Sequence, residues 1–226
     1  LLTNLDTIKL LSKAILSDNK LITANPTLTT SSNNTNDESG LYASTATNTG
    51  NSTYYFRGNV ENNYVSFACF TWRIVRINED GTVRLIMQDG INNNTNYQFN
   101  SNYNNYTYMY YSNSNAKTLL ENWYQMNIGS KADLAKNVAS GNYYCEQAKV
   151  KYSSDYTSEN ANMTLYSSYM PDFKCTTDGN GKGQVSASAG LLSYDEVVYA
   201  GGFSFVNNDN YYLFSSNNTM WTMSPA

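Results

Sequence analysis

The sequence predicts an α+β fold, because helical and strand-like patterns occupy separate parts of the chain. Apolar residues recur at helical spacing over residues 4–17, and a second helix pattern begins at Ser193. Between them, β-branched and aromatic runs at 72–77 and 83–87 flank a polar turn. We therefore expect a sheet built around this hairpin and covered by short helices.

The first helix is predicted from apolar residues that recur every three or four positions, namely Leu5, Ile8, Leu11 and Ile15. Residues at this spacing share one face of a helix, so the segment 4–17 should be amphipathic. The Thr-, Ser- and Asn-rich stretch that follows is typical of a linker. We therefore divide the chain into a helix and linker over 1–39 and an α+β domain over 40–226.

The hairpin is the strongest strand signal in the sequence. Its turn, residues 78–81, ends in Asp-Gly and lies between two apolar runs. Side chains alternate between the two faces of a strand, so Arg73 and Arg76 should lie on opposite faces. The residues expected to form most of the core of the sheet are Trp72, Ile74, Val75, Ile77, Leu85 and Ile86.

A helix of about two turns is predicted after Ser193. Glu196 follows three residues later, and this spacing forms a capping box in which each side chain accepts from the backbone N–H of the other residue. The pair Gly201 and Gly202 should end the helix, because glycine adopts the left-handed conformation without a Cβ penalty. So short a helix depends on tertiary packing.

The chain has three cysteines. Cys145 and Cys175 enclose a polar stretch, and a disulfide across it would stabilise an exported fold by about 3–4 kcal/mol. Cys69 directly precedes a predicted core strand, so we expect a small buried apolar residue there. The sequence leaves three pairings open, of which we favour Cys145–Cys175. The absence of a Cys-x-x-Cys spacing argues against a thiol redox or zinc site.

Charge and hydropathy restrict the class of partner. The formal net charge is −4 with 14 Lys and Arg, which argues against nucleic acid, since its binding depends on clustered basic residues. No apolar stretch approaches the length of a membrane-spanning helix. We therefore expect no nucleic acid partner, and membrane attachment only through an anchor that this sequence lacks.

Histidine is absent, which removes the usual general base at neutral pH and the commonest zinc ligand. The segment 178–183 begins like a calcium loop, but its twelfth position would be Ala189, where a bidentate Glu is required. We therefore expect no enzyme activity, no cofactor and no metal site.

Asparagine and tyrosine dominate the polar surface, with 34 Asn and 21 Tyr. Tyr with Asn and Ser combines rigid contact area with adaptable hydrogen bonding, a chemistry typical of recognition loops. The densest run, 92–115, contains the candidate ligand-binding residues Tyr103, Tyr106, Tyr108, Tyr110 and Tyr111. We expect the first four to be at least half exposed. The alternative is a low-charge extracellular surface without a ligand.

An ordered series of phrases extends over about residues 40–226. It comprises YYFRGN at 54–59, NYVSFA at 63–68, WRIVRINEDGTVRLI at 72–86, LLENWY at 119–124, Cys145, PDFKC at 171–175, the capped helix and WTMSP at 221–225. The series resembles a mostly uncharacterised group of surface-exposed proteins of low-GC Gram-positive (Bacillota) gut bacteria. In that group the two later cysteines recur, which supports their pairing, and position 69 is usually glycine.

At the level of fold, the capped helix and the Trp-Thr-Met-Ser phrase are similar to C-type-lectin-like domains of the formylglycine-generating type. This likeness implies a C-type-lectin-like mixed sheet with short helices after the N-terminal helix. Members of the surface-protein group carry an N-terminal anchor and continue past the final Ser-Pro into further strands. The resemblance therefore implies that this sequence is truncated at both ends.

The function expected from these features is an extracellular, cell-surface-attached, non-enzymatic recognition or adhesion module. Its partner would be a surface glycan or protein of the host or of a bacterium. One alternative is a structural subunit of a filament or pilus-like assembly that self-assembles through its N-terminal helix, and another is an accessory domain of an enzyme. An exposed apolar stripe on the helix would favour the filament, and a concave aromatic patch from 92–115 would favour binding.

Overall fold

A computed structural model describes the protein over residues 4–28, 37–91, 97–101, 110–146, 151–152, 163–164, 171–175, 183–202, 210–213 and 222–223. Helical elements are α1 (Asn4–Asp18), η3 (Tyr111–Asn113), α2 (Asn115–Tyr124), η4 (Gln125–Gly129), α3 (Ala132–Ala135) and α4 (Tyr194–Ala200). Strands are β1 (Gly40–Ser44), β2 (Thr53–Arg57), β3 (Tyr64–Phe67), β4 (Phe70–Ile77), β5 (Val83–Met87), β6 (Tyr143–Glu146), β7 (Lys151–Tyr152), β8 (Met163–Thr164) and β9 (Gly183–Ser186). The predicted α+β class is confirmed.

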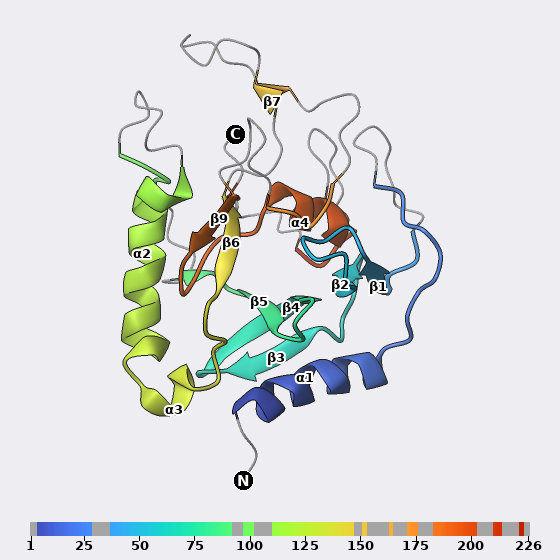
Figure 1. Cartoon of the computed structure of the whole chain (residues 1–226), viewed down its shortest axis with the longest axis horizontal. Helices are drawn as coiled ribbons and strands as arrows, with labels where there is room; N and C mark the ends of the chain where they lie inside the picture. Colours follow the sequence, from blue (N-terminus) through green and yellow to red (C-terminus); the bar gives the residue numbers. More distant parts are fainter. Residues whose placement is uncertain are drawn as a thin grey trace.

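The central sheet is antiparallel and has β4 at its centre (Figure 1). Along one side of β4, β3 pairs with its first half and β2 with its last two residues. Strand β1 continues the sheet beyond β2, and β5 pairs with the other side of β4. Among the described residues, the edge strands of the sheet are therefore β1 and β3 on one side of β4 and β5 on the other.

The predicted hairpin is present as β4 and β5. A register shift between Ile74 and Arg76 places one extra residue, Val75, in β4, and such a bulge interrupts the alternation of side chains. Ile74, Val75 and Ile77 are buried as predicted. The remaining three predicted core residues, Trp72, Leu85 and Ile86, are only partly buried.

The turn between β3 and β4 overturns the prediction of a buried Cys69. Ala68 and Cys69 have positive φ angles of 53° and 66°, and they form the two-residue connection between paired Phe67 and Phe70. Two consecutive left-handed residues are the geometry of a type I′ hairpin turn, which favours Asn and Gly. Cys69 therefore lies exposed at the tip of a hairpin rather than in the core.

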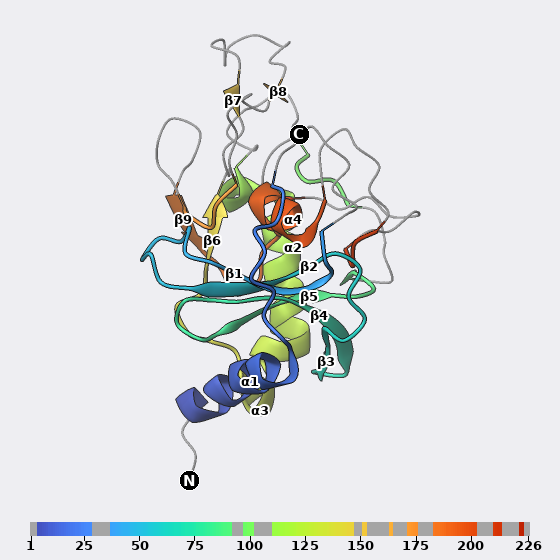
Figure 2. The same cartoon turned by 90° about the vertical axis from the view of Figure 1, so that its right-hand side faces the viewer.

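Helices α1 and α4 lie on opposite sides of the central sheet (Figures 1 and 2). In α1, whose range agrees with the predicted 4–17, Ile15 is buried and Leu11 packs partly buried against the same cluster. After the helix, Leu21 forms a parallel bridge to Leu41 of β1. These contacts join the predicted helix-and-linker segment to the core of the following domain.

Helix α4 has the predicted capping box. The Ser193 hydroxyl accepts from the Glu196 N–H at 3.1 Å, and the Glu196 carboxylate accepts from the Ser193 N–H at 2.9 Å. Gly201 ends the helix in the left-handed conformation, with φ 112°. The Ala200 carbonyl then accepts from Gly58 just after β2, so the C-terminus of α4 is fixed to the sheet.

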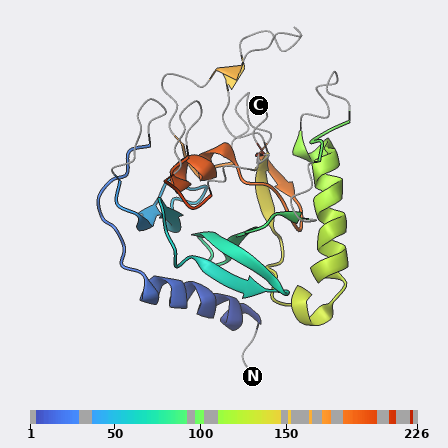
Figure 3. The same ribbon diagram turned by 180° about the vertical axis from the view of Figure 1, so that it is seen from behind.

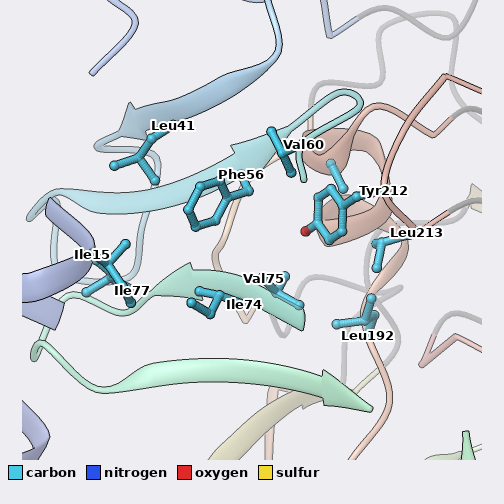
Figure 4. Close-up of a cluster of buried hydrophobic side chains, with 11 residues drawn as sticks. Ile15, Leu41, Phe56, Val60, Ile74, Val75, Ile77, Leu192, Tyr212 and Leu213 are labelled. Carbon is cyan, nitrogen blue, oxygen red and sulfur yellow. The ribbon is translucent and has the colours of Figure 1, made fainter. Parts of the chain in front are cut away.

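The main core contains side chains from α1, the central sheet, α4 and the segments 190–193 and 210–213 (Figure 4). Its buried members are Ile15, Leu41, Phe56, Val60, Ile74, Val75, Ile77, Leu192, Ala200, Tyr212 and Leu213. A second, aromatic cluster joins β1 and β2 to α4 through Tyr42, Tyr55, Phe173 and Tyr199. A third, around Tyr111, Ala116 and Met223, fixes the start of α2.

The predicted disulfide between Cys145 and Cys175 is present. It fixes β6, which pairs with β9 in a small separate sheet, to the segment 171–175. That segment bonds in turn to the chain just after β1, where the Phe173 N–H donates to the Ala46 carbonyl. None of the helices in the described part of the chain combines the length and apolar character that crossing a bilayer requires.

Candidate functional site

A cleft of about 1070 Å³ lies between β5, α2 and the segment 137–144 that leads into β6. Figures 1 and 3 show α2 running beside the sheet, with β6 nearer the centre of the molecule. This volume lies slightly above the usual range for small-molecule sites. We treat the cleft as the candidate binding site.

The lining follows two backbone segments without interruption. Every residue from 82 to 91 borders the cleft, and so does every residue from 137 to 144. A cleft over one face of a strand would contact alternate residues only, because side chains alternate between faces. The cleft therefore runs along the edge of β5 and faces the segment 137–144 across it.

Helix α2 forms the third wall and is held at its two ends. At its start, the Ser114 hydroxyl caps the helix by accepting from the Lys117 N–H at 3.1 Å. At its end, the Trp123 ring packs against Phe70 and Trp72, with centroids 5.2 and 6.2 Å apart. Between these anchors, Leu119 and Leu120 border the cleft, and Leu120 also packs partly buried against the third cluster.

A buried charge cluster lies beside the cleft. Glu196, whose side chain is 3% exposed, accepts from Arg76 of β4 at 3.0 Å and from Arg84 of β5 at 2.9 Å. Burial disfavours its charge, but Arg84 and Arg76 together hold the pKa of the carboxyl below its usual value. The same carboxylate caps α4, so one side chain joins the helix start to two strands.

Arg84 also connects two walls of the cleft. Its guanidinium donates to the Tyr143 carbonyl of β6 at 3.0 Å and stacks over the Tyr144 ring at 4.7 Å. Burial raises the pKa of the Tyr144 hydroxyl, so this ring stays neutral. The two strands that face each other across the cleft are thus bridged by one arginine.

Carboxylates lie near both ends of β5. Glu79 and Asp80 precede the strand, Asp89 follows it, and all three border the cleft. Partial burial opposes ionisation of Glu79, but hydrogen bonds from Thr49 hold its pKa below the usual value. The cationic side chains of the described lining are Arg76 and Arg84, and both are paired with Glu196. The cleft therefore has a net negative rim.

Of the five tyrosines predicted to bind a ligand, two lie among the described residues. Tyr111 is 0% exposed, because its ring lies in the third cluster and its hydroxyl donates to the Ala189 carbonyl at 2.8 Å. It is therefore a core residue. Tyr110 is less than half exposed, contrary to expectation. Tyr103, Tyr106 and Tyr108 lie outside the described residues.

The sequence did not predict most of the residues that line the cleft, although some of them belong to patterns that the sequence shows. Tyr97, from the Asn- and Tyr-rich run, borders the cleft and is partly exposed. Trp72, placed in the core by its strand position, borders it too, with its indole N–H donating to the Phe67 carbonyl at 2.9 Å. No sequence signal marked the segment 137–144, because its small and polar residues resemble an ordinary loop.

Two carboxylates near the cleft take part in structural hydrogen bonds. Glu121 accepts from the Ser188 N–H at 2.8 Å, and Glu146 accepts from the Ser112 N–H at 2.6 Å. Within the described ranges, no three His, Cys, Asp or Glu side chains gather closely enough to hold a metal ion. The arrangement offers aromatic rings, amides and backbone groups to a ligand.

Comparison of the chain with protein-family models, with curated proteins and with solved structures found no match.

Proposed function

We propose that this chain is an extracellular, non-enzymatic recognition or adhesion module attached to a bacterial surface, and that the cleft beside β5 holds its ligand. The observation that carries the proposal is a cleft of about 1070 Å³ whose lining combines apolar, aromatic and amide side chains. Sites of this size and composition bind ligands through shape and a few placed polar groups.

The disulfide supports the extracellular part of the proposal. Cys145 and Cys175 are bonded, and disulfides persist mainly in secreted proteins and on cell surfaces. The absence of histidine from the sequence supports a non-enzymatic role, because the usual general base is missing. The partner we propose is a glycan or protein on the surface of the host or of another bacterium.

The filament alternative has less support from the first helix. An assembly through α1 needs an apolar face that its own domain does not use. In the described side chains of α1, Ile15 and Leu11 pack into the main core, whereas the exposed Leu10 and Leu16 are six positions apart and do not share one stripe. We therefore favour recognition over filament assembly.

A blocking variant tests the proposal. Ser140 is exposed and borders the cleft, so Ser140→Trp should fill part of it, whereas Ser130→Trp places the same ring on an exposed residue outside the lining. The immobilised chain would be screened against a panel of glycans, matrix proteins and peptides. We expect at least one ligand whose binding is lost in Ser140→Trp and kept in Ser130→Trp. Equal binding by both variants, or no ligand in any panel, would contradict the proposal.

A further inference from the structure

The outer edge of β5 is available for pairing. The strand is bonded to β4 on one side only, and its other side faces the cleft. Edge strands present backbone donors and acceptors that other chains can join, and proteins usually cover or blunt them. The pairing of β5 with β4 determines which backbone groups of β5 face the cleft.

The ladder with β4 fixes the direction of each backbone group. The Gln88 N–H donates to the Thr71 carbonyl at 3.0 Å, and the Thr82 carbonyl accepts from the Asn78 N–H at 2.8 Å. Thr82 and Gln88 therefore turn their backbone groups toward β4. Residues alternate in an antiparallel ladder, and the bulge lies in β4, so alternation along β5 is unbroken.

The residues of β5 that turn their N–H and C=O groups away from β4 are consequently Val83, Leu85 and Met87. Within the described part of the chain, these backbone groups have no hydrogen-bond partner. A polar backbone group sealed away from water without a partner is costly, but these three border an open cleft. The strand thus presents a row of unused donors and acceptors to whatever enters.

The spacing of the outward backbone groups along β5 indicates which class of ligand can pair with them. Alternate residues of a strand are about 7 Å apart, and each presents one donor and one acceptor in the plane of the sheet. Another polypeptide in extended conformation has the same repeat. The hydroxyl groups of a sugar do not. Pairing of an added strand with a sheet edge is an established mode of peptide recognition.

The side chains and charges around the β5 edge indicate which peptide sequences fit it. Apolar residues of α2 and β5 flank the middle of the edge, whereas Asp80 and Asp89 lie just beyond its two ends. Neither carboxylate has a salt bridge within the described residues. The complement of this pattern is an apolar extended segment with a basic residue at each end.

We propose that the cleft binds an extended peptide segment of a partner protein, which pairs with Val83, Leu85 and Met87 and places Lys or Arg near Asp80 and Asp89. This inference rests on the proposed function and deepens it, because it names the ligand class of the same cleft. The bound segment becomes an added strand at the edge of the central sheet. Its backbone supplies most of the affinity, and its apolar side chains enter the space beside α2.

A display library of heptapeptides, with five random positions between two lysines, tests the inference. The library is selected on the wild-type chain and counter-selected on Ser140→Trp, and enriched peptides are made synthetically. Leu85→Pro removes the N–H that faces the cleft, and proline is tolerated on an edge when that N–H is unpaired. Leu85→Ala is the matched control, because both variants lose the leucine side chain. We expect Leu85→Pro to bind at least about tenfold more weakly than Leu85→Ala.

Amide exchange measured by NMR on the wild-type chain makes the test independent of how the proline variant folds. The enriched peptide should slow exchange at Val83, Leu85 and Met87 and leave Arg84 and Ile86 nearly unchanged, since their N–H groups already bond to β4. Asp80→Asn with Asp89→Asn should weaken binding and reduce its salt dependence.

Several outcomes would overturn the inference. These are a library without enriched peptides, equal binding by Leu85→Pro and Leu85→Ala, or unchanged exchange at the three outward amides. A glycan that binds the wild type and is blocked by Ser140→Trp would overturn the peptide inference and leave the proposed function standing. If no peptide and no glycan bound in a way that Ser140→Trp blocks, both the peptide inference and the proposed function would be overturned.

Discussion

Strands β1 and β5 lie at opposite edges of the central sheet, and they differ in whether the chain itself covers their outer side. At the β1 edge, the Leu41 carbonyl accepts from the Ile22 N–H at 2.8 Å, and Leu21 forms an isolated parallel bridge to Leu41. At the β5 edge, the outward groups of Val83, Leu85 and Met87 have no partner in the described residues. The backbone chemistry of both edges is the same. An edge that the chain covers itself stabilises the fold, and an edge left open within a cleft is available to a ligand.

One arginine holds the cover of the β1 edge in place. Arg57, 1% exposed, pairs with Asp37 at 2.8 Å and donates to the Thr27 carbonyl at 3.0 Å. It also donates to the carbonyls of Val198 and Tyr199 near the end of α4. Cations near a helix C-terminus satisfy carbonyls that lack an intrahelical partner. The cover of the β1 edge therefore depends on the buried charge of Arg57, just as the start of α4 depends on that of Glu196.

The largest expected effect is at Glu196, which joins β4 and β5 to α4. Glu196→Ala leaves the guanidinium groups of Arg76 and Arg84 buried without their carboxylate, and it should lower the free energy of unfolding by about 3–5 kcal/mol. Ser193→Ala removes only the cap and should cost about 1 kcal/mol. Urea unfolding of both variants measures the difference. Equal losses would mean that the carboxylate acts only as a cap.

The pH dependence of Glu196→Gln checks the same cluster. The pKa of Glu196 lies below its usual value in the folded protein, so its charge contributes stability above the unfolded pKa of about 4.3. This contribution is lost as pH falls through the folded pKa. The wild type should therefore be more stable than Glu196→Gln at pH 7, and the gap should shrink in acid. A gap independent of pH would contradict the charged state of Glu196.

The disulfide comes next, because it fixes β6, opposite the open edge, to the segment 171–175, which bonds to the chain just after β1. Replacing Cys145 and Cys175 together by Ser should lower the free energy of unfolding by about 3–4 kcal/mol. Cys69→Ser is the control and should change it little, since Cys69 is exposed. Thermal unfolding checks both. A larger effect from Cys69→Ser would contradict the pairing.

Arg57→Lys should open the closed edge. Lysine keeps the charge but lacks the planar fork that reaches Asp37 and backbone carbonyls together, and we expect a loss of about 2–3 kcal/mol. Exchange at the Ile22 amide should accelerate, while exchange within β5 stays the same. Arg73→Lys, on a partly exposed arginine stacked over Tyr64, is the matched control. Unchanged exchange at Ile22 would show that the cover does not depend on Arg57.

The smallest effect is at the hairpin tip. Cys69 has a φ of 66°, where a side chain is disfavoured and glycine is not. Cys69→Gly should raise the free energy of unfolding by about 1 kcal/mol, and Cys69→Ala should leave it nearly unchanged. Denaturant midpoints of the two variants provide the comparison. A less stable glycine variant would argue against the type I′ turn.

Local patterns predicted much of the fold. The helix over 4–17, the hairpin from 72 to 87 and the capping box at Ser193 each depend on residues close in sequence. The pairing of Cys145 with Cys175 was favoured because the stretch between them has few apolar residues, and it is confirmed.

The rest depends on contacts between distant residues. Arg76 and Glu196 are 120 positions apart, and nothing in either neighbourhood marks the other. Cys69 was predicted to be buried because it directly precedes a core strand. The two-residue turn at Ala68 and Cys69 gave no signal of its own, since it lacks the Asn or Gly that usually marks such a hairpin. Tyr111 belongs to a Tyr-rich run like its neighbours in sequence, but tertiary packing places its ring in a core. Composition alone therefore could not separate recognition residues from core residues.

Residue-resolved amide exchange of the unliganded chain tests the contrast between the edges most directly. Val83, Leu85 and Met87 should exchange fast, whereas Arg84 and Ile86 should exchange slowly because their N–H groups bond to β4. Ile22, which closes the other edge, should be protected as well. Equal protection of Leu85 and Ile86 would show that the β5 edge is already paired, and it would contradict the account.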